Sequence, residues 1–481
     1  MFTAGPVSRD KKTWGSRRPP LRLVRNRKGG AIGFSKMGHV GYGVLKTGPS
    51  WIKEGAMPAA KTTLRRMWNA LGPGLTTGAA DDDPSGIATY SQAGAQFGFA
   101  LTWTMFLTLP FMAAIQIISG CIGWQTRNGL ARNIGLRLPA PVLYMLVTLL
   151  VIANTINIAA DLAAMGAALR LVIGGPALLY ALTFGVACLA AEILIPYHRY
   201  AGYLKFLTLV LFVYVAAAFT VEVPWGKVLA STFLPKLSFQ RDFLLMIVAV
   251  FGTTISPYLF FWQASQEAED ARLSRGRKSH SEREPRGGFF RRISIDTWTG
   301  MLISNLIAFF IIVTTAVTLN AHGVTRIDTA AQAAEALRPI AGELTFALFA
   351  AGIIGTGLLA VPVLAGSAAY AVAETFGLRG SLELPADRAL GFYAIVGAAT
   401  LGGGALAATN IDPIAMLFWT AVINGVVAVP IMVAMMLVVS GGKGPRSVSL
   451  PRWLTLLGWL AAALMALAVG LLLWSSFAAG P

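Results

Sequence analysis

Two prolines interrupt long apolar runs of this sequence, and each interruption brings oxygen atoms with it. The run from Asp81 to Gly86 reads Asp-Asp-Asp-Pro-Ser-Gly, and the run from Thr253 to Tyr258 reads Thr-Thr-Ile-Ser-Pro-Tyr. A proline inside a helix leaves backbone carbonyls without donors. In a bilayer, free carbonyls and carboxylates are tolerated where unwound backbone lines a cavity. Such oxygens are the ligands of hard cations, so the pattern predicts cation binding.

We expect five residues at the two interruptions to surround the cation. The first offers the carbonyl of Ala80 and the carboxylate of Asp83, and the second offers the carbonyl of Thr253 and the hydroxyl of Ser256. Gly86 keeps the returning chain close to the ion. Hard oxygen ligands suit Mg²⁺, Ca²⁺ and Mn²⁺, whereas sulfur ligands would favour later transition metals.

The acidic triplet needs a separate interpretation. Asp82 points away from Asp83 in a helical or extended backbone, so the three carboxylates cannot all bind one ion. Either one of Asp81 and Asp82 lines an aqueous vestibule and attracts cations, or Asp82 binds a water of a hydrated ion. Three carboxylates this close cannot all ionise without a cation or a basic partner, which favours a metal over a neutral substrate.

The composition is that of a polytopic membrane protein. The 481 residues are 55% hydrophobic and 13% charged, against about 25% charged in soluble domains. Mean hydropathy is +0.64. The two cysteines lie in apolar runs, and all four histidines lie outside the predicted spans. This argues against a disulfide framework and an intramembrane zinc enzyme. We also expect no enzyme activity and no cofactor.

Apolar runs of roughly 20 residues predict an all-α fold with about eleven transmembrane helices. The spans are residues 68–96, 99–122, 141–166, 172–195, 201–221, 243–266, 294–318, 343–372, 388–408, 411–438 and 453–475. The first and sixth are predicted to be broken, the first with one half ending at Gly78 and the next beginning near Ser85.

The two breaks divide the transporter-like core, 67–440, into related halves. Pro84 and Pro257 each open a block of five spans, in 67–222 and 242–440. An odd number of spans turns the second block upside down, which predicts inverted repeats; paired interrupted segments are typical of secondary transporters and mark the substrate site. The span 453–475 is an extra helix outside the repeat.

Charge sets the expected orientation. Residues 1–66 carry fifteen Lys and Arg against two acidic residues, which is +13 of the net +17. We expect an integral protein of the bacterial inner (plasma) membrane, with this N-terminal segment as a disordered tail on the cytoplasmic side. The tail has too few aromatic residues for nucleic-acid binding. The polar segment 267–292 is expected to be a flexible cytoplasmic loop. Lipid is the expected surrounding, and nothing indicates protein partners.

Three segments resemble the first helix of the Nramp divalent-metal transporters. They are Gly72-Pro73-Gly74, Asp83 to Gly86, and Ala93 to Gly98. The segment from Ala160 to Ala163 is similar to the acidic helix-three motif of that family. The resemblance covers roughly 68–440. It implies two inverted five-helix repeats and proton-coupled uptake of Mn²⁺ and Fe²⁺.

The sequence departs from the Nramp pattern at four positions. The family's Asn is Gly86 here, its metal-selecting Met is Ser256, its helix-six His is Tyr258, and its second helix-three acid is Ala164. Loss of the thioether removes the soft ligand, and loss of the His and the acid removes two proton carriers. The pattern resembles the divergent Mg²⁺-transporting branch, whose roomier site admits a hydrated ion. The expected cargo is Mg²⁺ or Mn²⁺, with Fe²⁺ as a further candidate.

Four more residues are candidates for an ion or proton path. Asp161 lies mid-span, where a carboxylate is costly, and serves either this path or a polar contact to neighbouring backbone. Tyr258 takes the place of the family's His. Gln263 lies about two turns after Ser256 on the same face, so it lines an inner vestibule or packs between helices. For Asn424, the resemblance implies an oxygen near the occluded site.

Three other functions compete with metal transport. An amino-acid or organic-cation transporter of the same fold needs free helix N-termini for a carboxylate, and the acidic triplet disfavours it. An intramembrane aspartyl protease needs a Gly-x-Gly-Asp motif, which this sequence lacks. A channel stays open as an alternative, although two breaks in inverted repeats favour a carrier.

Overall fold

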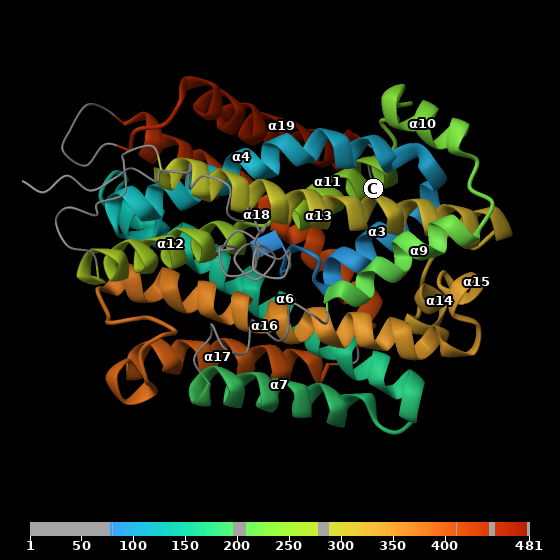
Figure 1. Ribbon diagram of the computed structural model, residues 1–481, viewed down its shortest axis with the longest axis horizontal. Coiled ribbons are helices and arrows are strands. Elements are labelled where there is room, and N and C mark those ends of the chain that lie inside the picture. Colours follow the sequence, from blue (N-terminus) through green and yellow to red (C-terminus); the bar gives the residue numbers. More distant parts are fainter. Residues whose placement is uncertain are drawn as a thin grey trace, which may run out of the picture. The chain divides into compact units, whose positions relative to one another are not determined.

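The structure is a computed structural model built from helices (Figure 1). It describes residues 77–78, 80–195, 208–277, 288–409, 411–441 and 448–478, and no strand occurs among them. These residues belong to one compact unit, Ala60–Pro481. The predicted basic tail and most of the first half of the first span lie outside the described residues.

The helices follow the predicted spans closely. Their bounds are α3 Pro84–Phe97, α4 Thr102–Thr126, α5 Leu130–Gly135, α6 Ala140–Ile173, α7 Ala177–Leu194, α9 Phe212–Thr220, α10 Trp225–Phe233, α11 Arg241–Thr254, α12 Pro257–Arg277, α13 Gly288–Thr318, α14 Ala330–Glu335, α15 Arg338–Ala341, α16 Thr345–Phe376, α17 Leu390–Ala407, α18 Pro413–Ser440 and α19 Arg452–Ala478.

Nine helical runs of the described chain are long and apolar enough to cross a membrane. A bent pair, Leu209–Thr220 and Trp225–Phe233, meets at 117° and raises the number to ten. The run Pro84–Thr126 holds both α3 and α4, so it covers two predicted spans. Each of the eleven predicted spans therefore has a helix, and the predicted all-α membrane fold is confirmed.

The two halves of the core interlock. α3 packs against α13, and α12 packs against α4, so the first helix of each half contacts the second helix of the other. This reciprocal pairing is the one that inverted repeats produce. Glycines allow the closest approaches: a Cβ at Gly94 would overlap the backbone of α13, and one at Gly252 would overlap that of α18. Small residues serve helix packing in this way in membranes.

Two details of the sequence prediction are wrong. Thr77, Gly78, Ala80 and Asp81 are helical, so the first half-helix extends past Gly78 to the acidic triplet. The segment 267–292 is largely helix, because α12 runs to Arg277 and α13 begins at Gly288; residues 278–287 lie outside the described part.

Partner contacts explain why that polar segment is helical. Arg292 forms a 2.7 Å ion pair with the fully buried carboxylate of Glu267. Its guanidinium also lies 4.5 Å from the ring centroid of Trp124 on α4. Polar sequence composition predicted a loop, but a paired buried charge joins α12 to the start of α13, and a cation–π contact joins α13 to α4.

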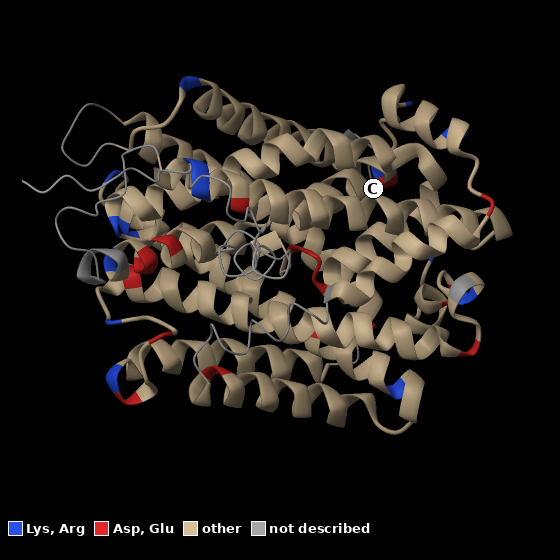
Figure 2. Ribbon diagram, in the orientation of Figure 1, with Lys and Arg blue, Asp and Glu red and all other residues tan. Residues whose placement is uncertain are grey.

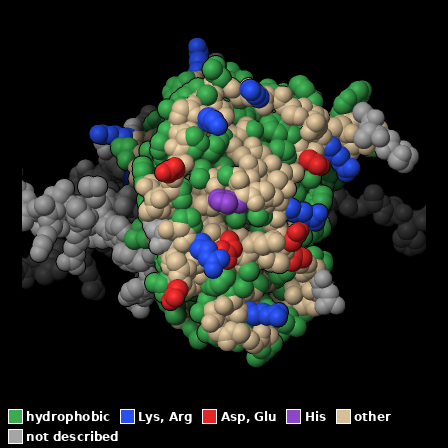
Figure 3. All heavy atoms as spheres, turned by 90° about the vertical axis from the view of Figure 1, so that its right-hand side faces the viewer, with side chains coloured by type: hydrophobic (Ala, Val, Ile, Leu, Met, Phe, Trp, Pro, Cys, Tyr) green, Lys and Arg blue, Asp and Glu red, His purple; other side chains and the backbone are tan. Residues whose placement is uncertain are grey.

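The charges separate the ends of the bundle from its interior. In Figure 2 most Lys, Arg, Asp and Glu lie toward the helix ends, and an acidic segment precedes α3 in the middle of the bundle. Figure 3 looks onto the end formed near α9, α10, α14 and α15, where side chains of both signs are scattered. The acidic segment before α3 therefore lies inside the bundle, away from the charged helix ends.

Candidate functional site

The first break is stabilised by the N-cap of α3. Asp83 has extended backbone (φ −69°, ψ 170°) and is the N-cap, with Pro84 at the first helical position. Its Oδ1 accepts hydrogen bonds from the Ser85 hydroxyl and from the Gly86 N–H, both 2.7 Å. A capping Asp followed by Pro is a strong helix start, so the sequence itself ends one half-helix and begins the next. The other oxygen of Asp83 stays free of the cap.

The second break is centred on Ser256. α11 ends at Thr254, and α12 starts at Pro257. The Ser256 hydroxyl lies 2.9 Å from both the Gly252 and the Thr253 carbonyl oxygens, to which it can donate. The break removes backbone N–H donors that a continuing helix would offer to the last carbonyls of α11, and the Ser256 hydroxyl takes their place. One of these carbonyls is the Thr253 carbonyl that the sequence analysis assigned to the ion.

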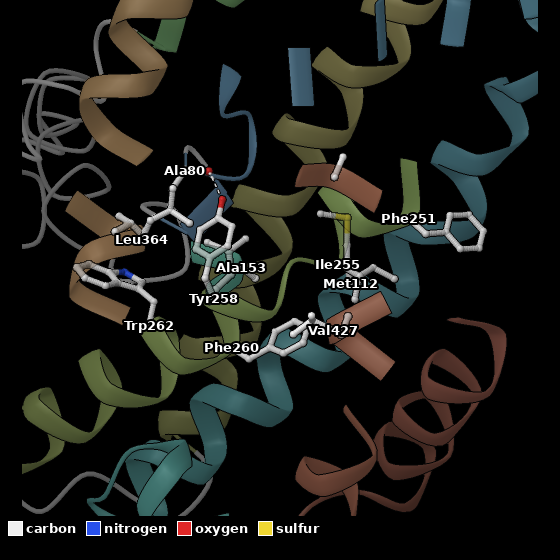
Figure 4. Close-up of a cluster of buried hydrophobic side chains, with 14 of the residues drawn as sticks. Ala80, Met112, Ala153, Phe251, Ile255, Tyr258, Phe260, Trp262, Leu364 and Val427 are labelled. Carbon is white, nitrogen blue, oxygen red and sulfur yellow. Dashed lines mark hydrogen bonds between the residues drawn. The ribbon is translucent and has the colours of Figure 1, made fainter. Parts of the chain in front are cut away.

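A tyrosine joins the two breaks. The Tyr258 hydroxyl donates a 2.9 Å hydrogen bond to the Ala80 carbonyl and lies 3.5 Å from Asp83 Oδ2. Figure 4 shows Tyr258 pointing at Ala80, with Trp262 one turn further along α12. Ala80, Asp83 and Tyr258 are almost completely buried. Both helices are thus broken where predicted, and the breaks lie side by side.

The other two carboxylates of the triplet face α13. The Ser304 hydroxyl lies 2.7 Å from Asp81 Oδ2 and 3.0 Å from Asp82 Oδ1. Both acids are buried, and Asp81 Oδ1 has no hydrogen-bond partner. Asp82 and Asp83 have different neighbours, as their adjacent positions predicted. No group of three or more His, Cys, Asp or Glu side chains in the described chain is arranged to hold a metal.

A further polar wall surrounds Gly86. A Cβ placed on Gly86 would lie 3.1 Å from Thr253 Oγ1, 3.3 Å from the Tyr90 ring and 3.4 Å from the Asp81 carbonyl oxygen. The hydroxyls of Tyr90 and Thr253 are buried and interact with each other, but neither has a further hydrogen-bond partner. The sequence analysis missed Tyr90, although it lies one turn after Gly86 on the same helix face. It also missed Ser304, for which a single Ser in an apolar helix gave no signal.

The four predicted path residues are all buried. Both carboxylate oxygens of Asp161 lack partners, and this group interacts electrostatically with Asp83. The Gln263 amide donates a 3.1 Å hydrogen bond to Thr297 of α13. Neither amide atom of Asn424 has a partner. Their roles in an ion or proton path stay predictions.

The site is rich in acid and poor in base. In the described part of the chain, no Lys or Arg lies within ion-pair distance of Asp81, Asp82 or Asp83. Uncompensated buried carboxylates are costly, so the arrangement calls for a cation or protons. Carboxylate, carbonyl and hydroxyl oxygens are the groups at hand, and they are typical of hard-cation sites.

Two hollows approach the bundle from different sides. One, of about 640 Å³, is lined by residues of α3, α11 and α18, among them Gln92, Asp242 and Trp419. The other, of about 470 Å³, is lined by α12 and α16, including Glu269 and Glu374. Neither lining includes a residue of the two breaks. The 640 Å³ hollow lies along α3, the second half of the first broken span. The 470 Å³ hollow lies along α12, the second half of the sixth span.

The comparisons with known proteins agree with this architecture. A family model described as Nramp, natural resistance-associated macrophage protein-like, matches residues 74–475. The chain belongs to the Nramp family. Members of this family are transporters, so the chain is a membrane-embedded transporter rather than an enzyme, and it uses no cofactor.

Curated relatives are identical to this Nramp chain at about a quarter of the aligned positions. It is 27% identical over 306 residues to the divalent metal cation transporter MntH of Yersinia enterocolitica, covering 62% of this chain and 71% of that protein. It is 28% identical over 296 residues to the MntH of Erwinia tasmaniensis, covering 60% and 68%.

Solved structures support the fold. The crystal structure of an Eremococcus coleocola manganese transporter, in complex with an aromatic bis-isothiourea substituted compound, has a TM-score of 0.65 at 15% identity. The alignment covers 86% of this chain and 87% of that one. Mhp1, a nucleobase-cation-symport-1 family transporter, has a TM-score of 0.52 at 14% identity, covering 85% and 93%. At these identities the likeness concerns the fold alone.

Proposed function

We propose that this Nramp protein moves a divalent metal cation across the membrane by alternating access. The observation that carries the proposal is the hydrogen bond from Tyr258 to the Ala80 carbonyl, beside Asp83. It brings two half-helix ends and an acidic cluster to one buried place. Carriers of inverted-repeat folds bind their ions at such paired breaks.

The ion would be held by the residues assigned from the sequence. Asp83, the carbonyls of Ala80 and Thr253, and the Ser256 hydroxyl would supply oxygens; Gly86 would allow the chain to approach, and Asp82 would act through water. In the present conformation Tyr258 and Ser256 make hydrogen bonds to the two carbonyls. A carbonyl oxygen has two lone pairs, so it can also bind an ion.

The donor set favours Mg²⁺ or Mn²⁺ as cargo. Every group that meets at the two breaks presents oxygen. Ser256 stands where the Nramp pattern has a Met, whose thioether suits a softer metal. The relatives named MntH are divalent metal cation transporters, which supports the class of cargo. Asp161, Tyr258, Gln263 and Asn424 would line the path of the ion or of accompanying protons.

The two hollows support alternating access. One reaches the second half of the first helix and the other reaches the second half of the sixth, with the buried breaks outside both. With the basic tail on the cytoplasmic side of a bacterial inner membrane, the hollow beside Gln92 would open to the opposite side. Each hollow would then deepen toward the breaks in turn.

A flux assay in proteoliposomes tests the proposal. Purified full-length protein should accelerate uptake of Mg²⁺ or Mn²⁺, and each ion should inhibit uptake of the other. Uptake with and without a pH gradient tests proton coupling separately. Uptake of an amino acid or organic cation without any metal flux would overturn the proposal.

A further inference from the structure

We propose that the hydroxyls of Tyr90 and Thr253 hold a water molecule of the hydrated cation, so that Tyr90 determines specificity for ions that keep their water. The inference rests on the proposed function, because it assigns a role within the same site. It concerns the wall around Gly86, apart from the contact between Tyr258 and Ala80.

The first support is that two buried hydroxyls have no partner other than each other. Tyr90 is fully buried and Thr253 is 1% exposed, and apart from their interaction with each other Tyr90 Oη and Thr253 Oγ1 have no hydrogen-bond partner within the protein. Buried polar groups are nearly always paired, and an unpaired one calls for an explanation such as a water or an ion. Two such groups from different helices, α3 and α11, are found at this wall.

The second support is their position. Thr253 Oγ1, the Tyr90 ring and the Asp81 carbonyl oxygen all lie around the side of Gly86 that has no side chain. The Tyr90 hydroxyl also interacts electrostatically with Asp81, Asp82 and Asp83. A ligand at this wall would therefore meet two hydroxyls, a carbonyl and the field of three acids.

The chemistry of this wall fits a bound water better than a bare ion. A neutral hydroxyl both donates and accepts hydrogen bonds, so it can bind a water that is itself bound to a metal. Mg²⁺ loses its water reluctantly and usually keeps several waters in protein sites. Hydroxyls that hold such a water would favour Mg²⁺ over an ion that enters with fewer waters.

The test compares Tyr90→Phe with Tyr214→Phe. Tyr214 is a matched control, because it too is buried and its hydroxyl interacts with another hydroxyl, that of Ser91, but it lies on α9. Uptake of Mg²⁺ and of Mn²⁺ is measured below saturation in proteoliposomes of the full-length protein. Tyr90→Phe should lower Mg²⁺ uptake by about three- to tenfold and Mn²⁺ uptake much less. Tyr214→Phe should leave the ratio of the two rates unchanged.

Thr253→Val provides a second variant, since it removes the hydroxyl and keeps the backbone carbonyl. It should shift the ratio in the same direction as Tyr90→Phe. The stabilisation of each variant by Mg²⁺ and by Mn²⁺ in a thermal-shift assay gives a readout that does not require transport. An unchanged ratio in both variants, or an equal loss for both ions, overturns the inference.

The outcomes also separate this inference from the proposed function. If the unmodified protein carries a divalent metal and Asp83→Asn does not, while Tyr90→Phe keeps the original Mg²⁺ to Mn²⁺ ratio, only the water-binding role fails. If the unmodified protein carries no divalent metal, the proposed function fails first.

Discussion

The hydroxyl of Tyr258 donates a 2.9 Å hydrogen bond to the carbonyl oxygen of Ala80, which lies 178 residues earlier in the chain. This contact joins the second half of the sixth span to the end of the first half of the first span. The carbonyl is one of the oxygens that the sequence assigned to the cation. Tyr258 therefore donates to a proposed ligand of the cation and connects the two breaks.

Tyr258→Phe should separate stability from metal binding. Removing the hydroxyl leaves the buried Ala80 carbonyl without its donor, which costs about 1–3 kcal/mol. A bound cation would satisfy that carbonyl, so the metal-bound form should lose less stability than the free form. Thermal unfolding with and without Mg²⁺ or Mn²⁺ should show a larger metal-induced shift in the variant. A smaller shift than in the unmodified protein would contradict this role for Ala80.

Ser304→Ala should lower the stability of the protein, because it removes a hydroxyl that contacts two buried carboxylates. The Ser304 hydroxyl is within hydrogen-bond distance of both Asp81 and Asp82, and its loss leaves two buried carboxylates with fewer partners. We expect a loss of about 1–3 kcal/mol in unfolding free energy. Ser304→Thr keeps a hydroxyl and should recover part of the loss.

Ser91→Ala is the matched control for Ser304→Ala. The Ser91 hydroxyl is also buried, but it forms no hydrogen bond to a carboxylate and lies beside the Tyr214 hydroxyl instead. Thermal unfolding of the purified variants should therefore leave Ser91→Ala close to the unmodified protein. Equal effects of Ser91→Ala and Ser304→Ala would show that the contact to the acids has no special weight.

Gly252→Ala should disturb the support of the second break. Its Cβ would overlap the Ala421 carbonyl and the backbone of Gly425 on α18, so α11 would have to move. Overpacking of this kind costs about 1–3 kcal/mol. Gly470→Ala on α19 is the control, because its added Cβ would meet nothing within 4 Å beyond its own stretch of helix. Size-exclusion profiles and melting temperatures in detergent measure both; a melting temperature for Gly252→Ala that equals that of Gly470→Ala would refute the close packing.

Local sequence signals predicted the breaks but not their partners. Asp83 and Pro84 define a helix start by short-range chemistry, and Ser256 and Pro257 interrupt the other helix in the same way, so both positions were predictable. The contacts of Ser304 with Asp81 and of Tyr258 with Ala80 join residues 223 and 178 positions apart. Such pairs depend on how the helices pack, and nothing in one sequence marks them.

The error at 267–292 has the same physical origin. Its polar composition predicted a loop, whereas Glu267 is buried because Arg292 reaches it from the next helix. Composition reports the average solvent preference of a segment, while a single ion pair at a helix interface changes what can be buried. The position of Tyr90 beside Gly86 was predictable from its spacing on the helix, but the surroundings of its hydroxyl were not.

The most direct test of the account is metal uptake by Asp83→Asn in proteoliposomes, with Asp387→Asn as the control. Asp387 is an exposed acid in the short 3-10 helix Ala386–Arg388, so its change removes the same charge away from the breaks. We predict that Asp83→Asn lowers uptake of Mg²⁺ and Mn²⁺ at least tenfold, whereas Asp387→Asn keeps it. Uptake by folded Asp83→Asn at the rate of the unmodified protein would contradict a cation site at the two breaks.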